Sequence, residues 1–203
     1  MRGLEPYQDE SEGTVFRDVI LLALAGFIAI VLLLIPHIAV PGAREADHAQ
    51  PPGNILVEAR WPDGSTADVD LWVQAPGDTP VGYSNRSGLI FDLLRDDLGS
   101  RGDLSDLNHE IAVGRGVRPG EHTVNLHLYR AAGAPLPIQV EVKVSVRPPE
   151  GGGTAVLLTR DVVLRREGEE LTVARFALDA AGRLVPGSLH ALHRPLRAAR
   201  PPA

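Results

Sequence analysis

The sequence predicts an all-β protein in which one N-terminal transmembrane helix is followed by an antiparallel β-sandwich of the immunoglobulin-like kind. Two observations carry this prediction. Residues 19–40 are apolar and carry no charge, and at about 1.5 Å per residue they reach roughly 33 Å, enough to cross a hydrocarbon core of about 30 Å. After residue 54, short segments alternate apolar and polar residues between turns rich in Gly and Pro. This alternation is typical of sandwiches in which each sheet buries one face.

The N-terminal segment and the apolar run together predict an uncleaved membrane anchor. Residues 1–18 form a short tail in which Arg2 and Arg17 are outnumbered by acidic residues. A signal peptide has a basic start and an apolar core of about 7–15 residues, and this segment has neither. Lys and Arg accumulate on the cytoplasmic side of a span. Arg2, Arg17 and the amino terminus, set against Arg44, therefore indicate a bacterial inner-membrane protein with a cytoplasmic N-terminus and a periplasmic C-terminal domain.

The rest of the chain predicts a linker, one domain and a tail. Residues 41–53 contain Pro, Gly and mixed charges, which predicts a linker. Residues 54–187 hold the alternating segments and predict the sandwich domain, and residues 188–203 predict a disordered basic tail. Within the domain we expect a hairpin over 55–74 that turns at 62–65, a short helix over 89–98, an acidic loop over 99–108, strands over 111–113, 124–128 and 138–146, and a hairpin over 154–179.

Asp18 adjoins the apolar run, and the sequence allows two interpretations of it. At 100° per residue, Asp18, Ala25 and Ala29 fall within about 20° of one another on a helix, and Leu22 lies one turn from Asp18. Ala25 and Ala29 form a small-xxx-small pair, which predicts a homodimer through this helix. An ionisable residue on such a face is a candidate proton relay. Alternatively, Asp18 lies at headgroup level near the helix N-terminus, where a carboxylate is favourable without any further function.

Residues 16–22, Phe-Arg-Asp-Val-Ile-Leu-Leu, resemble the start of the single span in ExbD/TolR-type subunits of proton-driven motor complexes, and the similarity covers residues 16–35. The resemblance implies a short cytoplasmic tail, one span and a periplasmic domain. It also implies that Asp18 takes up and releases protons against a multi-span partner of the ExbB/TolQ type. The sequence departs from this family at Arg17, where an apolar residue is usual, and in its domain, because the family carries a smaller mixed α/β unit.

A second resemblance covers residues 54–130. Three segments carry it: Asp-Val-Asp-Leu-Trp-Val at 68–73, Pro-Gly-Asp at 76–78, and the strand from Pro-Gly-Glu-His at 119–122 to Tyr129. They are similar to the corresponding segments of a bacterial β-sandwich family of unknown function. The resemblance implies the fold of the domain and no activity.

Acidic side chains supply the candidate metal ligands. Asp68 and Asp70 lie two residues apart on a predicted strand, so both carboxylates point to one face. They could bind calcium, although the spacing fits no EF-hand loop, and a solvated acidic loop is the alternative. His190 and His193 could offer two ligands on one helical turn without an evident third, and a disordered tail is the alternative. For the calcium site of Asp68 and Asp70, the residues that could add oxygen ligands from nearby in the sequence are Asp92, Asp96, Asp97, Asp103, Asp106 and Asn108.

The net charge and the absence of known motifs argue against several classes of function. The net charge of −6 argues against a nucleic-acid partner, and without Cys there is no disulfide or thiolate site. No common hydrolase, phosphate-loop, dinucleotide or zinc-protease motif is present, so we expect no catalytic residue, no cofactor and no enzyme. The sequence predicts a bitopic subunit of a proton-channel complex that couples proton flow to an envelope process. The alternative is a membrane-anchored adaptor that binds a periplasmic protein or an envelope polymer and translocates no ions.

Overall fold

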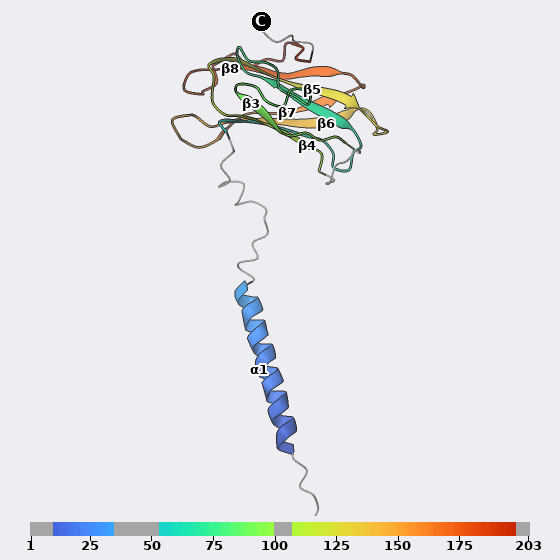
Figure 1. Cartoon of the computed structure of the whole chain (residues 1–203), viewed down its shortest axis with the longest axis vertical. Coiled ribbons are helices and arrows are strands. Elements are labelled where there is room, and N and C mark those ends of the chain that lie inside the picture. The colour runs from blue at the N-terminus through green and yellow to red at the C-terminus, as the bar shows by residue number, and fades with distance from the viewer. Residues whose placement is uncertain (1–9, 35–52, 100–106, 198–203) are drawn as a thin grey trace, which may run out of the picture. The chain divides into compact units, whose positions relative to one another are not determined.

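A computed structural model describes residues 10–34, 53–99 and 107–197 of the chain. The chain divides into two compact units, residues 1–50 and residues 51–203. The first unit contains helix α1 (Glu10–Leu34), drawn in blue in Figure 1. Within the described residues, its segment Val15–Leu34 is the one helix that is long and apolar enough to cross a membrane.

Helix α1 begins earlier than the sequence predicts. Residues 10–18, expected in the N-terminal tail, are helical and run without interruption into the apolar segment. They contain no proline, so every backbone N–H can join the helical hydrogen-bond pattern. The predicted span over 19–40 is helical as far as Leu34; its last six positions, the linker to residue 52 and residues 1–9 lie outside the described residues.

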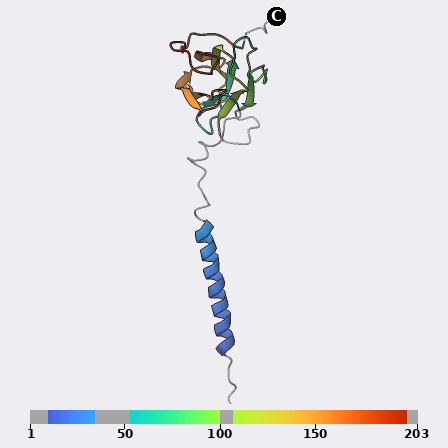
Figure 2. The same cartoon turned by 90° about the vertical axis from the view of Figure 1, so that its left-hand side faces the viewer.

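The described part of the second unit consists of two antiparallel sheets, seen from two sides in Figures 1 and 2. One sheet has the strand order β3-β4-β1-β6-β7 and the other the order β2-β5-β8. The predicted combination of one apolar helix and a mostly β chain is therefore confirmed at this level. The strands are β1 (Ile55–Arg60), β2 (Asp68–Gln74), β3 (Phe91–Arg95), β4 (His109–Gly114), β5 (Gly120–Arg130), β6 (Ile138–Val146), β7 (Ala155–Leu164) and β8 (Glu170–Leu178).

Alternate residues of the strands from both sheets meet in one hydrophobic core. Along β6, the five apolar residues at even positions from Ile138 to Val146 are buried, whereas Gln139 and Glu141 are exposed. Successive side chains of a strand point to opposite faces, so this spacing of two buries one complete apolar face. β1 and β5 contribute in the same way, through Ile55, Val57 and Ala59 and through Val124, Leu126 and Leu128.

Two hairpins expected from the sequence do not form. β1 and β2 belong to different sheets, and so do β7 and β8. β1 pairs with β4 on one side and with β6 on the other, so no edge of β1 is left for β2. The turns at 62–65 and near residue 168 therefore carry the chain from one sheet to the other instead of closing hairpins.

Residues 91–95 form strand β3, where the sequence suggested a short helix over 89–98. Phe91 and Leu93 are buried and point into the core, whereas Leu94 is exposed. β3 pairs with β4, with Phe91 opposite Gly114 and Leu93 opposite Ala112. The backbone hydrogen bonds to a neighbouring strand and the burial of two large side chains outweigh the local helical pattern.

Part of the outer side of sheet β2-β5-β8 is covered by segments outside the strands. On β5, Thr123, Asn125 and His127 alternate with core residues and are nevertheless buried. Residues 188–197 cover part of this side: Asn125 Nδ2 donates to the backbone oxygen of Arg194 at 2.7 Å, and Leu196 is buried. These residues therefore differ from the predicted disordered tail, because they satisfy buried polar groups of the sheet; residues 198–203 lie outside the described residues.

Candidate functional site

Asp18 lies about two turns inside helix α1, because the helix begins at Glu10. The helix-end interpretation requires a helix that starts close to Asp18, since the favourable effect of the dipole falls off within the first turn. Asp18 lies beyond the first turn, so the dipole part of that interpretation is not met, whereas the headgroup level of Asp18 stays a prediction. Asp18 and Arg17 are both exposed and lie within the apolar segment Val15–Leu34.

The residues predicted to share a packing face with Asp18 lie in the same uninterrupted helix. Leu22, Ala25 and Ala29 are all exposed in the single chain. Helical geometry places Ala25 and Ala29 about one turn apart on the side of Asp18. Their small side chains leave room for the backbone of a second helix to approach.

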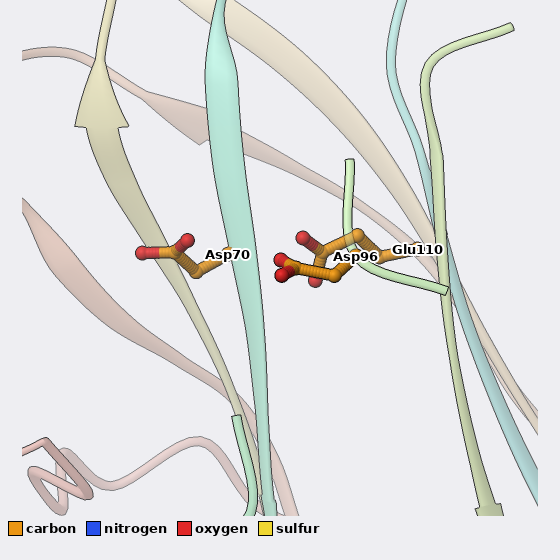
Figure 3. A group of neighbouring side chains, drawn as sticks. All are labelled: Asp70, Asp96 and Glu110. Atoms are coloured by element: carbon orange, nitrogen blue, oxygen red, sulfur yellow. The ribbon is translucent and has the colours of Figure 1, made fainter. Parts of the chain in front are cut away.

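The second unit contains a cluster of three carboxyl groups, on Asp70 of β2, Asp96 just after β3, and Glu110 of β4. One oxygen from each residue lies within 4.8 Å of the others. Figure 3 shows the carboxyl groups of Asp96 and Glu110 next to each other. Among the described residues this is the one group of three or more such side chains close enough to share a metal ion.

Glu110 has a structural role that explains its burial. β2 is an edge strand, and at Val73 its outer edge is paired with Val81. Two residues earlier on the same edge of β2, the N–H of Leu71 donates to Glu110 Oε2 at 2.5 Å. The N–H of Asp97 donates to the other oxygen, Oε1, at 3.3 Å. The carboxylate therefore takes the place of a neighbouring strand and satisfies backbone donors that would otherwise be buried without partners.

Burial changes the acidity of two members of the cluster. Loss of solvation raises the pKa of Glu110 well above its usual value, and Asp70 and Asp96 raise it further. The pKa of Asp70 is also raised by burial, although its hydrogen bond with His127 opposes this shift. Asp70 Oδ2 lies 2.7 Å from His127 Nδ1. The cluster can thus relieve the repulsion among its carboxylates by holding protons.

The two predicted calcium candidates separate in the structure. Asp70 joins the cluster, whereas Asp68 pairs with Arg130 at 2.8 Å. Of the other candidate oxygen ligands that are described, Asp96 belongs to the cluster and the rest have other partners. Asp92 pairs with Arg115 at 2.7 Å, and Asn108 Nδ2 donates to the carbonyl groups of residues 62 and 65 in the turn. Asp97 accepts hydrogen bonds from the backbone N–H groups of residues 99 and 109. Asp103 and Asp106 lie outside the described residues.

The histidine pair of the C-terminal segment is tied to the sheet rather than placed on a helix. The backbone N–H of His190 donates to the carbonyl of Arg175 at 2.9 Å, and the carbonyl of His190 accepts the N–H of Arg175. His190 Nε2 lies 3.6 Å from Glu121. Residues 190–193 are not helical, so the one-turn spacing on which the metal interpretation of His193 depended does not occur.

Sequence reasoning missed Glu110 and His127 as members of this site. Both lie in strands, beside apolar neighbours, and belong to no motif. The one available signal was a carboxylate directly before the apolar strand residues Ile111 and Val113, which is an unusual place for an unpaired charge. The position of the cluster depends on three strands that are distant in sequence.

The chain matches no protein-family model, no curated protein and no solved structure. Its function is therefore inferred from the arrangement of its own residues.

Proposed function

We propose that this chain is a single-pass protein of the bacterial inner membrane that holds an immunoglobulin-like β-sandwich in the periplasm as a binding module. The observation that supports this proposal is the division of the chain into an apolar helical unit and a separate two-sheet unit. The two-sheet unit has its own core, built from both sheets. Helix α1 supplies the anchor, and its 0% burial within the chain suits a segment surrounded by lipid or by partner helices.

The orientation follows from the arginines that flank the span. Arg2 lies before the apolar segment, Arg17 lies near its N-terminal end, and Arg44 follows it. This distribution favours a cytoplasmic N-terminus. The two-sheet unit then faces the periplasm, where it can bind a protein or an envelope polymer.

We expect C-terminal fusions to report a periplasmic domain. A phosphatase reporter that folds only outside the cytoplasm should be active at the C-terminus, and the fusion should sediment with membranes. A fluorescent reporter that folds only in the cytoplasm should be dark at the C-terminus and bright at the N-terminus. The reverse pattern, or a protein that remains in the soluble fraction, would contradict the proposed anchor and orientation.

A second candidate function, proton relay, is favoured by the position of Asp18. Its carboxylate stands about two turns inside the helix and within the apolar segment, beside Arg17. Ionisable residues inside a spanning segment usually face a partner or a water-filled path, and Asp18 is the fourth residue of this segment. In this proposal Asp18 faces a multi-span partner of the ExbB/TolQ type, and the Ala25 and Ala29 seam packs against a helix.

Asp18→Asn is expected to abolish the relay function, because the amide keeps the size of the side chain and cannot release a proton. Membrane insertion, abundance and partner binding should be unchanged. Ala25→Leu should instead weaken association by blocking the close approach of a helix. Complementation of a deletion strain and partner pull-down in mild detergent measure the two effects separately.

Glu10→Gln is the matched control, since it removes a carboxylate at the first residue of the same helix. It should complement fully. An Asp18→Asn protein with full activity would end the relay candidate and leave the anchored binding module in place.

A further inference from the structure

Aromatic side chains gather on the outer side of sheet β2-β5-β8. Trp72 of β2 and Tyr83, in the segment after it, lie edge to face with ring centroids 5.6 Å apart. Tyr83 and Tyr129 of β5 follow at 6.1 Å, and His127 lies 6.2 Å from Tyr129. The whole chain contains three Tyr and two Trp, and three of these five residues lie in this one patch.

The patch presents two rings to solvent over a buried third. Tyr83 is 40% exposed and Tyr129 is 46% exposed, whereas Trp72 is 4% exposed. Leu71 and Val73, the neighbours of Trp72, point into the core, so Trp72 points to the outer side of the sheet. We call the two exposed tyrosines the platform: Tyr83 packs edge to face against Trp72, and Tyr129 adjoins Tyr83 with its ring tilted by 46°.

The loop that carries Tyr83 is held in place. Val81 and Val73 exchange backbone hydrogen bonds of 2.8 and 2.9 Å, and Asn85 Nδ2 donates to the carbonyl of Pro80 at 2.8 Å. Gly82 lies directly against the indole, because a Cβ added there would come within 2.4 Å of a Trp72 ring atom. Only glycine allows this approach, and the next residue, Tyr83, meets Trp72 edge to face.

A hollow of about 290 Å³ adjoins the platform. It is bordered by the indole of Trp72, the loop after β2 and the C-terminal segment, including Thr79, Ser84, Asn85, Leu196 and Arg197. The hydroxyls of Thr79 and Ser84, the amide of Asn85 and the guanidinium of Arg197 give this hollow both donors and acceptors of hydrogen bonds.

The chemistry of the patch selects the ligand class. Exposed tyrosine rings can stack against the apolar C–H face of a sugar ring, and the adjoining polar groups can bond to its hydroxyls. A cationic ligand is disfavoured, because the guanidinium of Arg130 already lies over Tyr129, 5.1 Å from the ring centroid. We propose that this aromatic patch binds a saccharide chain, which would make an envelope polysaccharide the ligand of the binding module proposed above. The inference rests on that proposed function.

The test uses full-length protein in detergent micelles and oligomers of β-1,4-linked N-acetylglucosamine, with maltohexaose as a second probe. Binding is measured by calorimetry and by tryptophan fluorescence. Trp72 contacts Tyr83 in the patch and can report on binding there. The second tryptophan, Trp61, lies in the core, where its indole N–H donates to the carbonyl of Ala67. We expect at least one of these saccharides to bind and to change the emission, and Trp72→Phe to remove that change.

Substitution of the platform should lower the affinity. The double variant Tyr83→Ala, Tyr129→Ala is expected to lose about tenfold or more in affinity, whereas the double Phe variant keeps the rings and most of the binding. Leu136→Ala, at a leucine that is 44% exposed outside the patch, is the matched control and should bind normally. Far-UV spectra check that each variant is folded.

Failure of this inference is distinct from failure of the proposed function. If neither saccharide binds, or if the double Ala variant binds as well as the parent protein, the saccharide assignment is overturned. A membrane-anchored protein with a periplasmic domain would still stand after that result. A soluble or inverted protein in the fusion experiment would overturn the binding-module proposal by a separate measurement.

Discussion

Acidification from pH 6.5 to pH 4 is expected to remove roughly 3 kcal/mol of folding free energy from the two-sheet unit through His122 alone. This side chain is fully buried between two phenylalanines: it stacks on Phe176 with ring centroids 5.4 Å apart, and it meets Phe91 edge to face with ring centroids 6.1 Å apart. Burial lowers the pKa of His122 from 6.5 to about 4, and a hydrogen bond between Nδ1 and the carbonyl of Gly120 opposes the shift. The ring is therefore neutral in the folded protein over a range in which the unfolded chain takes up a proton.

The sign of the effect follows from the two pKa values. Above pH 6.5 the imidazole is neutral in both states, and its contribution to stability is complete. Between pH 6.5 and about 4 the unfolded state binds the proton and the folded state does not, so stability falls as the pH falls. Below about pH 4 both states are protonated and this loss levels off.

Urea unfolding at a series of pH values measures this term. His122→Phe keeps a ring between Phe91 and Phe176 and has no titrating group, so the loss below pH 6.5 should be about 3 kcal/mol smaller in the variant. Phe is larger than His, and overpacking can lower stability equally at every pH. The pH dependence, and not the offset, is therefore the quantity compared. Parallel curves for the two proteins would contradict the buried neutral histidine.

Glu110→Leu is expected to destabilise the two-sheet unit by about 1–3 kcal/mol for each buried donor that it leaves unpaired. The donors are the backbone N–H groups of Leu71 and Asp97. Glu110→Gln should cost much less, because its carbonyl oxygen can still accept the N–H of Leu71. The comparison separates the hydrogen bond from the charge of this side chain.

The charge of Glu110 has its own pH dependence, opposite in sign to that of His122. Because the pKa of Glu110 is raised well above 4.5, the folded protein holds a proton there after the unfolded chain has released it. Stability from this group is therefore complete below pH 4.5 and is lost as the pH rises through the raised pKa. Relative to the parent protein, Glu110→Gln should become more stable as the pH rises.

The matched control is Glu141→Gln, at a glutamate that is exposed on β6. It should leave the stability unchanged across the same range. Equal stabilities for Glu110→Leu and Glu110→Gln would show that the carboxylate does not support the edge of β2. A Glu110→Gln curve parallel to that of the parent protein would contradict the raised pKa.

The positions of most elements could be read from the sequence. The apolar run predicted the membrane-length helix, and the alternation of five aliphatic residues from Ile138 to Val146 predicted β6 and its buried face. Both patterns report how one segment divides its surface between water and an apolar environment, which is a local property of the residues. The proton-relay role of Asp18 stays a prediction.

Pairing and the site depended on the tertiary structure. A period of two shows that a segment is a strand but not which strand lies beside it, so β1 and β2 were expected to form a hairpin and instead lie in different sheets. Glu110 meets Leu71 and Asp97, and Tyr83 meets Trp72 and Tyr129, only after these crossings bring distant segments together. Burial then set the pKa values of His122 and Glu110. The sequence alone determined which surfaces are apolar, and the three-dimensional packing decided which polar groups had to find partners among them.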